Sequence, residues 1–223
     1  MTTALELENL RCLRGGRVLF DAVSAALSAG QMLRVLGENG SGKTSLLRML
    51  CGLGAADNGE VRWQGRPIVA LRDEFNRQLV YLGHAPALKD DLSALENLQA
   101  ACGLAGVPCT AREAALALAQ AGLCGREALP VRVLSQGQRK RVGIARLALG
   151  HTAGLWVLDE PFDALDDAAC TWLQGLISAQ LARGGVVVLT SHQGRAWGSM
   201  PPQVALTLRA PTALAARPIA YAE

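Results

Sequence analysis

Alternating and continuous apolar patterns mark the expected strands of this chain. Residues 5–8 (Leu-Glu-Leu-Glu) alternate between apolar and polar side chains, as a half-buried strand does. Residues 23–28 and 31–36 are further candidate strands, with a Gly-Gly turn at 15–16 before the first of them. Residues 155–161 and 185–192 contain short uninterrupted apolar runs, which are typical of strands buried in a parallel sheet. The pattern predicts an α/β core.

The sequence between residues 84 and 149 has a different texture, rich in Ala and Leu, and predicts a helical lobe inserted into that core. Two helix starts carry the capping-box pattern S/T-x-x-E, at Ser93–Glu96 and at Thr110–Glu113. We expect residues 1–83 and 150–208 to form the core and residues 209–223 to be a loose tail.

Length and composition favour a single substantial domain. The chain has 223 residues, 50% of them hydrophobic, and a formal net charge of only +3, with dispersed basic residues that indicate a solvated surface and no direct nucleic-acid partner. Six cysteines form no C-x-x-C pair, so reduced thiols in a cytosolic protein are expected. No apolar run is long enough to span a bilayer, and the acidic start does not resemble a secretory peptide. We expect a soluble protein, or one held at a membrane by its partners.

The candidate strand 31–36 runs into a glycine-rich loop and then into a helix expected from Thr44 through Leu53. The loop matches G-x-x-x-x-G-K-[ST], and glycine lets its backbone N–H groups turn inward around anionic oxygens. Lys43 supplies a mobile positive charge for the β- and γ-phosphates, and Thr44 offers a hydroxyl to Mg²⁺. The residues expected to contact the nucleotide here are Gly37, Glu38, Asn39, Gly40, Ser41, Gly42, Lys43, Thr44 and Ser45.

Two carboxylates follow the apolar run that ends at residue 158. We expect Asp159, on a strand neighbouring that of the loop, to hold Mg²⁺, and Glu160 to orient attacking water or take its proton. His192 ends the next apolar run, where its imidazole is within expected reach of the γ-phosphate or the water.

A third capping box, S-x-x-Q, starts a helix at Ser135 with Gln138 at its third position and Gly137 between them. The following G-Q-R-K-R makes this helix start rich in donors, and such an end binds anions. Because the phosphate loop of the same chain already has Lys43, we expect this end to contact a nucleotide on another subunit.

These motifs together resemble the ATP-binding-cassette (ABC) ATPases over essentially the whole chain. The matching segments are G-E-N-G-S-G-K-T, L-S-Q-G-Q, L-W-V-L-D-E-P, A-L-D at 164–166 and the histidine at 192, in the family's order. The resemblance implies a P-loop NTPase (RecA-like) core with an N-terminal antiparallel β subdomain and a helical lobe. It also implies hydrolysis of ATP with Mg²⁺ in a head-to-tail homodimer, where Ser135, Gly137 and Gln138 contact the ATP of the partner.

Two positions depart from the family pattern. His84 stands where the family usually has a glutamine that contacts Mg²⁺, and an imidazole can also bind a metal or hold water. Arg14 stands where an aromatic side chain usually stacks on adenine, and a planar guanidinium can also stack on a purine.

The segment 81–98 resembles the CcmA-type proteins of cytochrome c maturation, the ATP-binding subunits of haem exporters. That resemblance implies an ATPase on the cytoplasmic face of the bacterial inner membrane, peripheral to a separate membrane-spanning subunit and powering release of a haem-loaded chaperone. The sequence itself contains no haem-binding motif, so the haem assignment rests on the resemblance. Two alternatives stay open: an ABC importer or multidrug-exporter subunit with other cargo, and a soluble ABC protein acting on nucleic acid or the ribosome.

Overall fold

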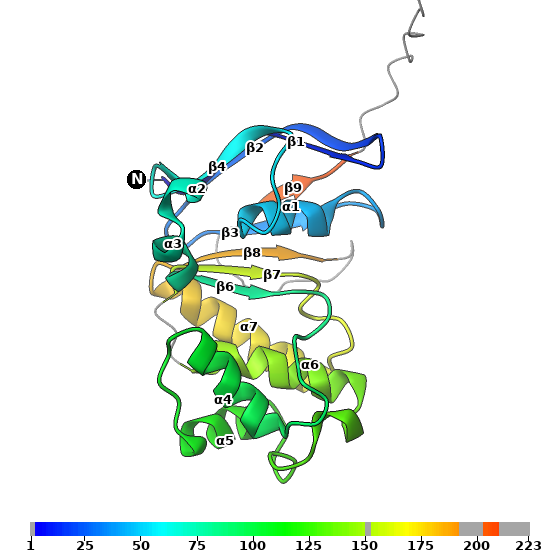
Figure 1. The fold of residues 1–223 in the computed structure, drawn as a ribbon, viewed down its shortest axis with the longest axis vertical. Coiled ribbons are helices and arrows are strands. Elements are labelled where there is room, and N and C mark those ends of the chain that lie inside the picture. Colours follow the sequence, from blue (N-terminus) through cyan, green and yellow to red (C-terminus); the bar gives the residue numbers. More distant parts are fainter. Residues whose placement is uncertain (1–2, 150–152, 192–202, 210–223) are drawn as a thin grey trace, which may run out of the picture.

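The computed structural model describes residues 3–149, 153–191 and 203–209. Within these ranges an antiparallel sheet lies above a parallel sheet, with a helix between the two, and a group of helices lies below (Figure 1). The predicted parallel-sheet core with an antiparallel β subdomain and a helical lobe is confirmed.

The antiparallel sheet has the strand order β2-β1-β4-β5. A long hairpin joins β1 (Thr3–Arg14) to β2 (Arg17–Ser28), and two glycines with positive φ form its turn, as predicted. The other edge of β1 pairs with β4 (Asn58–Trp63), which in turn pairs with the short β5 (Arg66–Pro67). The expected strands 5–8 and 23–28 are confirmed as parts of longer strands.

The parallel sheet has the order β6-β7-β8-β3-β9. Its strands are β3 (Met32–Leu36), β6 (Leu79–Leu82), β7 (Leu155–Leu158), β8 (Val186–Thr190) and β9 (Gln203–Thr207). Every residue of β7 and β8 is buried, as their uninterrupted apolar sequences predicted. The expectation that the strand before Asp159 neighbours the strand of the loop is wrong, because β8 pairs with both and separates them.

Helices cover both faces of the parallel sheet. On one side α1 (Lys43–Leu50) packs in a core shared with the antiparallel sheet, next to the short α2 (Ile68–Leu71) and α3 (Asp73–Arg77). On the other side α7 (Asp167–Ala182) buries Leu173 and Ile177 in a second core. The prediction that the helix after the loop reaches Leu53 is wrong: Gly52 takes a positive φ just past its end and leaves Leu53 57% exposed.

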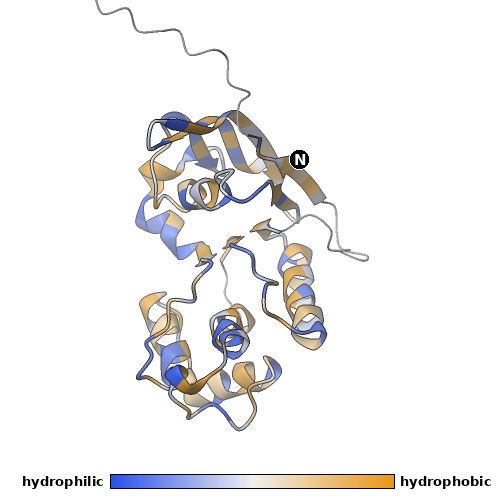
Figure 2. Ribbon diagram, turned by 90° about the vertical axis from the view of Figure 1, so that its right-hand side faces the viewer, coloured by the Kyte–Doolittle hydropathy of each residue, from blue (hydrophilic) through white to orange (hydrophobic). Residues whose placement is uncertain are grey.

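The helical lobe contains α4 (Ala94–Leu104), α5 (Ala111–Gln120) and α6 (Gln136–Ala145), with 3₁₀ turns at Val131–Val133 and Arg146–Ala148. All three predicted capping boxes are formed. The lobe has its own hydrophobic core, which includes Leu98 and Leu118, and its helices carry both hydrophobic and hydrophilic residues along their length (Figure 2). Each helix therefore has one face inside the lobe and one outside.

Candidate nucleotide-binding and catalytic site

The glycine loop between β3 and α1 adopts a shape that only glycine accommodates at key positions. Gly42 has φ 95°, and a Cβ there would lie 3.0 Å from the Phe20 ring. Gly37 is equally restricted, since a Cβ would lie 2.5 Å from Ser41 Oγ. Because no side chain caps the start of α1, its first N–H groups remain available to an anion.

Lys43 lies folded against this loop with only 7% of its surface exposed. Its Nζ donates to the carbonyl of Gly37 at 2.8 Å and to that of Glu38 at 3.2 Å. Two carbonyl contacts leave a third ammonium donor for a phosphate oxygen. The charge is thus held at the centre of the loop before any ligand arrives.

Thr44 and Asp159 meet although they are far apart in the chain. Thr44 Oγ1 donates to Asp159 Oδ2 at 2.8 Å, and Thr190 Oγ1, from the intervening β8, donates to Asp159 Oδ1 at 2.7 Å. Asp159 is 3% exposed, so both carboxylate oxygens are fixed in direction. Hydroxyl and carboxylate oxygens are the donors that Mg²⁺ prefers, and the chemistry of this pair fits that ion.

Glu160 follows in a left-handed backbone conformation, with φ 48°. Its N–H donates to Thr190 Oγ1 at 2.7 Å, and its Oε2 lies 3.3 Å from Nδ1 of His84. Both side chains line a cavity of about 490 Å³, and Gly40, Lys43 and Thr44 line it from the loop side. The structure therefore brings the predicted phosphate-binding and water-activating residues to one cavity.

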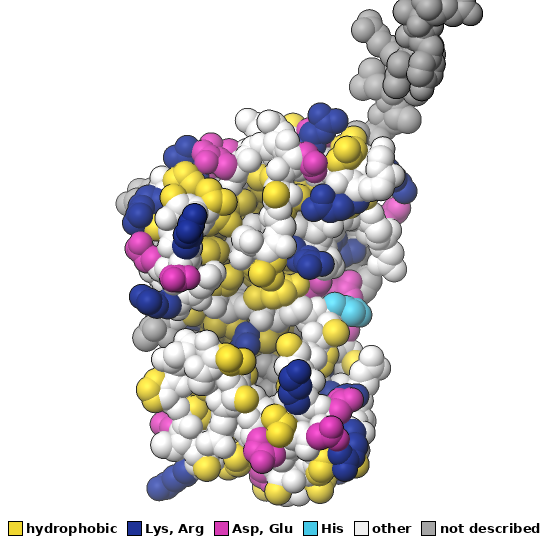
Figure 3. Space-filling model, in the orientation of Figure 1, with side chains coloured by type: hydrophobic (Ala, Val, Ile, Leu, Met, Phe, Trp, Pro, Cys, Tyr) yellow, Lys and Arg dark blue, Asp and Glu magenta, His cyan; other side chains and the backbone are white. Residues whose placement is uncertain are grey.

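The histidine side chain in Figure 3 lies at the surface, and His84 is the only histidine among the described residues. Its side chain is 69% exposed and forms an ion-pair contact with Glu160, whereas Thr44 and Asp159 contact each other. Among the described residues no group of three His, Cys, Asp or Glu side chains forms a metal site. A metal contact from His84 stays a prediction.

The Ser135 helix start lies away from this cavity. Ser135 is exposed, and its Oγ accepts from the N–H of Gln138 at 3.3 Å while Gln138 Oε1 accepts from the N–H of Ser135 at 3.0 Å. Gly137 packs closely on the chain after Glu160, where an added Cβ would lie 2.7 Å from the carbonyl of Ala164. None of Ser135, Gly137 and Gln138 is among the residues lining the phosphate cavity of its own chain.

Arg14 is a surface residue at the end of β1. Its Nη1 donates to the carbonyl of Leu13 and lies 3.9 Å from Asp57 Oδ2, and its side chain is 51% exposed. Leu19 of β2 lines the phosphate cavity instead. Base stacking by Arg14 stays a prediction, and His192 lies outside the described residues.

Two residues that bind the backbone of Glu160, Thr190 and Lys140, were not predicted from the sequence. The position of Thr190 at the end of a buried parallel strand was an available signal, because ligands bind at the carboxyl ends of such strands. Lys140 donates through Nζ to the carbonyl of Glu160 from α6. No local pattern indicates that contact, since it depends on how the lobe packs against the core.

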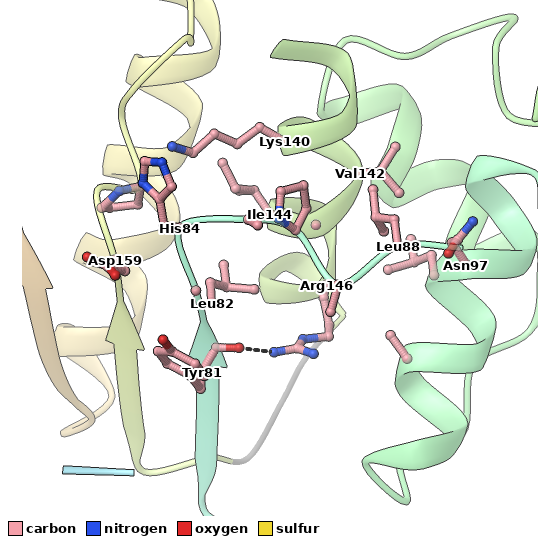
Figure 4. Close-up of a pocket in the computed structure, with 18 residues that line it drawn as sticks. Tyr81, Leu82, His84, Leu88, Asn97, Lys140, Val142, Ile144, Arg146 and Asp159 are labelled. Atoms are coloured by element: carbon pink, nitrogen blue, oxygen red, sulfur yellow. Dashed lines mark hydrogen bonds between the residues drawn. The ribbon is translucent and has the colours of Figure 1, made fainter. Parts of the chain in front are cut away.

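A second, mainly apolar pocket of about 170 Å³ adjoins the site between the end of β6 and α6 (Figure 4). Arg146 crosses it and donates to the carbonyl of Tyr81 at 2.7 Å. Burial lowers the pKa of Arg146, and burial together with Asp159 raises the pKa of Tyr81. The segment with His84 borders both this pocket and the phosphate cavity.

Comparison with known families agrees with this geometry. Residues 20–163 match the model of the ABC transporter family. The chain belongs to this family. A cytochrome c biogenesis ATP-binding export protein CcmA from Aromatoleum aromaticum is 53% identical, over 91% of this chain and 94% of its own. The protein of the same name from Nitrosomonas europaea is 50% identical, over 85% and 88%.

Solved ABC structures share the fold. A putative ABC transporter ATP-binding protein from Pyrococcus furiosus superposes with a TM-score of 0.76 at 24% identity, over 91% of this chain and 96% of that one. An ATP-binding subunit of another ABC transporter superposes with a TM-score of 0.75 at 25% identity, over 85% and 80%. The ABC fold of this chain thus extends beyond the segment that matches the family model.

Proposed function

We propose that this chain is the ATP-hydrolysing subunit of an ABC export complex in cytochrome c biogenesis, where it powers haem export or release of a haem-loaded chaperone. The observation that carries the ATPase assignment is the 2.8 Å contact between Thr44 of the glycine loop and Asp159 at the end of β7. It joins the phosphate loop to Asp159, and the neighbouring Glu160 lines the same cavity as the loop residues. The names of relatives that are about half identical support the cargo.

In the proposed mechanism each residue of the cavity has a separate task. The loop N–H groups and Lys43 bind the phosphates and stabilise the charge that develops on the leaving group. Thr44 and Asp159 would hold Mg²⁺, which when bound neutralises charge on the phosphate oxygens. Glu160, which lines the same cavity as Lys43, orients water and accepts its proton. His84 holds the Glu160 carboxylate, and His192 is proposed to position the γ-phosphate.

The exposed Ser135 helix start supports a dimer. We propose a head-to-tail homodimer in which Ser135, Gly137 and Gln138 of one protomer complete the phosphate site of the other. ATP closes this dimer, and hydrolysis reopens it. We also propose that the guanidinium of Arg14 stacks on the base of the nucleotide and so affects nucleotide selectivity.

Coupling to transport requires a separate integral membrane subunit. None of the described helices is long and apolar enough to cross a membrane. We propose peripheral attachment on the cytoplasmic face of the inner membrane, with residues 84–149 acting as the lobe that moves against the core of residues 1–83 and 150–208, and residues 209–223 as a tail. On the face in Figure 3 positive and negative side chains are interspersed, which supports a protein partner over nucleic acid.

Purification of the tagged chain from membranes tests the cargo and the partner. We expect a haem-exporter membrane subunit to co-purify, and haem addition with its chaperone to change the ATPase rate of that complex. Co-purification of an amino-acid or drug permease would overturn the proposal.

The variant Glu160→Gln tests the catalytic assignment, because it keeps the shape of the side chain and removes the proton acceptor. We expect ATP to bind with nearly parental affinity, turnover to fall by about 100-fold or more, and an ATP-bound dimer to accumulate in size-exclusion chromatography. Parental turnover would show that another group activates the water.

A further inference from the structure

The Glu160 peptide needs support from outside its own segment. Glu160 is a non-glycine residue in the left-handed region, and such a strained conformation persists only where the surroundings fix it. On one side of this peptide the Glu160 N–H donates to Thr190 Oγ1, from a fully buried residue of β8. The carbonyl on the other side accepts from the N–H of Asp163, three residues along the same segment, at 3.2 Å.

Lys140 supplies a second donor to that carbonyl from a different part of the fold. It belongs to α6 of the helical lobe, and its Nζ donates to the carbonyl of Glu160. Figure 4 shows its side chain reaching from α6 toward His84, which contacts the Glu160 carboxylate. Both the backbone and the side chain of Glu160 therefore depend on groups at the junction of the core and the lobe.

The ammonium group of Lys140 is partly removed from water and lies near several carboxylates. Burial lowers the pKa of Lys140, whereas the carboxylates of Asp163, Glu160 and Asp159 raise it. An ammonium taken from water is stable only where acceptors and opposite charge compensate for its lost hydration. The Glu160 carbonyl and these acidic side chains provide that compensation for the ammonium group of Lys140.

Lys140 lies on α6, the helix that begins at the Ser135 cap. The two are five positions apart in the chain, which places their side chains about 140° apart around the helix. Ser135 is exposed, and Lys140 points inward to the catalytic strand end. Lys140 is therefore a direct contact between α6 and the backbone of Glu160.

We propose that Lys140 is a positioning residue that fixes the Glu160 peptide and thereby joins the helical lobe to the catalytic carboxylate of the same chain. This inference rests on the proposed role of Glu160 in hydrolysis. Lys140 is not among the residues that line the phosphate cavity. Its removal affects the rate of hydrolysis and leaves nucleotide binding to the loop.

The test is ATP turnover by the complex purified from membranes through a tag on this chain, with Lys140→Met as the variant. We expect kcat to fall by about 10- to 100-fold, because a small displacement of a catalytic group has effects of this size. KM for ATP is expected to change by less than about threefold, since the loop is intact. Lys140→Arg, which keeps a cationic donor, is expected to restore most of the rate.

Lys89→Met is the matched control, because Lys89 is an exposed lysine of the lobe. We expect parental kcat, KM and thermal midpoint for this variant. A structural role of Lys140 would lower the thermal midpoint of Lys140→Met and leave kcat per folded complex unchanged, and that result would overturn the proposal. Equal loss in the Met and Arg variants would overturn it as well.

Glu160→Gln separates this inference from the function on which it rests. If Glu160→Gln hydrolyses ATP at the parental rate, the catalytic assignment fails and the positioning role with it. If Glu160→Gln is inactive and Lys140→Met has parental kcat, only the positioning role fails. In single-turnover measurements the double variant is expected to be no slower than Glu160→Gln alone, because Lys140 acts through that side chain.

Discussion

Thr44 and Asp159 in the core are 115 residues apart in the chain, whereas Ser135 and Gln138 in the lobe are three residues apart. The first pair meets only because β3, β8 and β7 follow one another in the sheet, and Thr44 of this pair lines the phosphate cavity. The second pair forms within one helical turn, and Ser135 stays exposed. The core thus builds its part of the site by long-range packing, and the lobe has a locally formed helix end, which we propose completes the site of a second chain.

The largest effect is expected from a substitution in the phosphate loop, which belongs to the core. Lys43→Ala removes the positive charge held against the loop carbonyls, so we expect ATP turnover to fall by about 1,000-fold or more. Nucleotide binding, measured by isothermal titration calorimetry, is expected to weaken in parallel. Lys89→Ala in the lobe serves as the control with the same change of charge. Parental kcat and KM for Lys43→Ala would contradict the assignment of the loop.

A smaller effect is expected from substitutions at two capping serines of the lobe, which test whether the lobe contributes to the nucleotide site. Ser93 and Ser135 are both N-cap serines in complete capping boxes, so replacing either by alanine removes one cap and costs about 1 kcal/mol of stability. Only Ser135 is expected to contact ATP across the dimer. We expect Ser135→Ala to lower kcat by about 10- to 100-fold and Ser93→Ala to leave it near the parental value.

The comparison of these two serines is measured as thermal midpoint and as ATPase rate of the purified complex. Similar shifts in midpoint with different rates would support a trans contact by Ser135. Equal rates in the two variants would mean that the Ser135 helix start is only structural.

The smallest expected effect concerns pH. Hydrogen bonds from Ser93 hold the pKa of Glu96 below its ordinary value, and those from Thr110 do the same for Glu113. A depressed folded-state pKa stabilises the protein above the ordinary glutamate pKa, and this contribution is lost as pH falls through the lower, folded value. The box of α6 has the neutral Gln138 and lacks this dependence.

We therefore expect the double variant Glu96→Gln/Glu113→Gln to lose less stability than the parent as pH falls from neutral into the acid range. Thermal midpoints measured across that range check this, with ATPase activity at neutral pH expected to stay near parental. A midpoint that falls as steeply in the variant as in the parent would mean that other carboxylates control the acid sensitivity of the fold.

Prediction from the sequence was most successful where a structure follows from neighbouring residues. The glycine loop, the three capping boxes and the buried strands β7 and β8 depend on local backbone preference and on apolar runs. The helix α7 and the strand β9 were not predicted. A five-residue edge strand such as β9 has a weak pattern, and its pairing with β3 is a property of the sheet.

The order of strands in the parallel sheet was also not predictable from local sequence patterns. Asp159 was correctly assigned to a strand end, yet its strand is not next to that of the loop. The intervening β8 contributes Thr190, which binds the carboxylate of Asp159 and the N–H of Glu160. Local patterns do not specify strand order, because that order depends on how all strands and covering helices pack together.

By itself the sequence determined which groups are available: a glycine loop with Lys43 and Thr44, two carboxylates after a buried strand, and a serine-capped helix start. Each follows from residues within a few positions of one another. The tertiary structure alone decided that Thr190 and Lys140 hold the Glu160 peptide and that the Ser135 helix start faces away from its own cavity. Those contacts join residues 20 to 30 positions apart, and only the packing of the sheet and the lobe brings them within hydrogen-bonding distance.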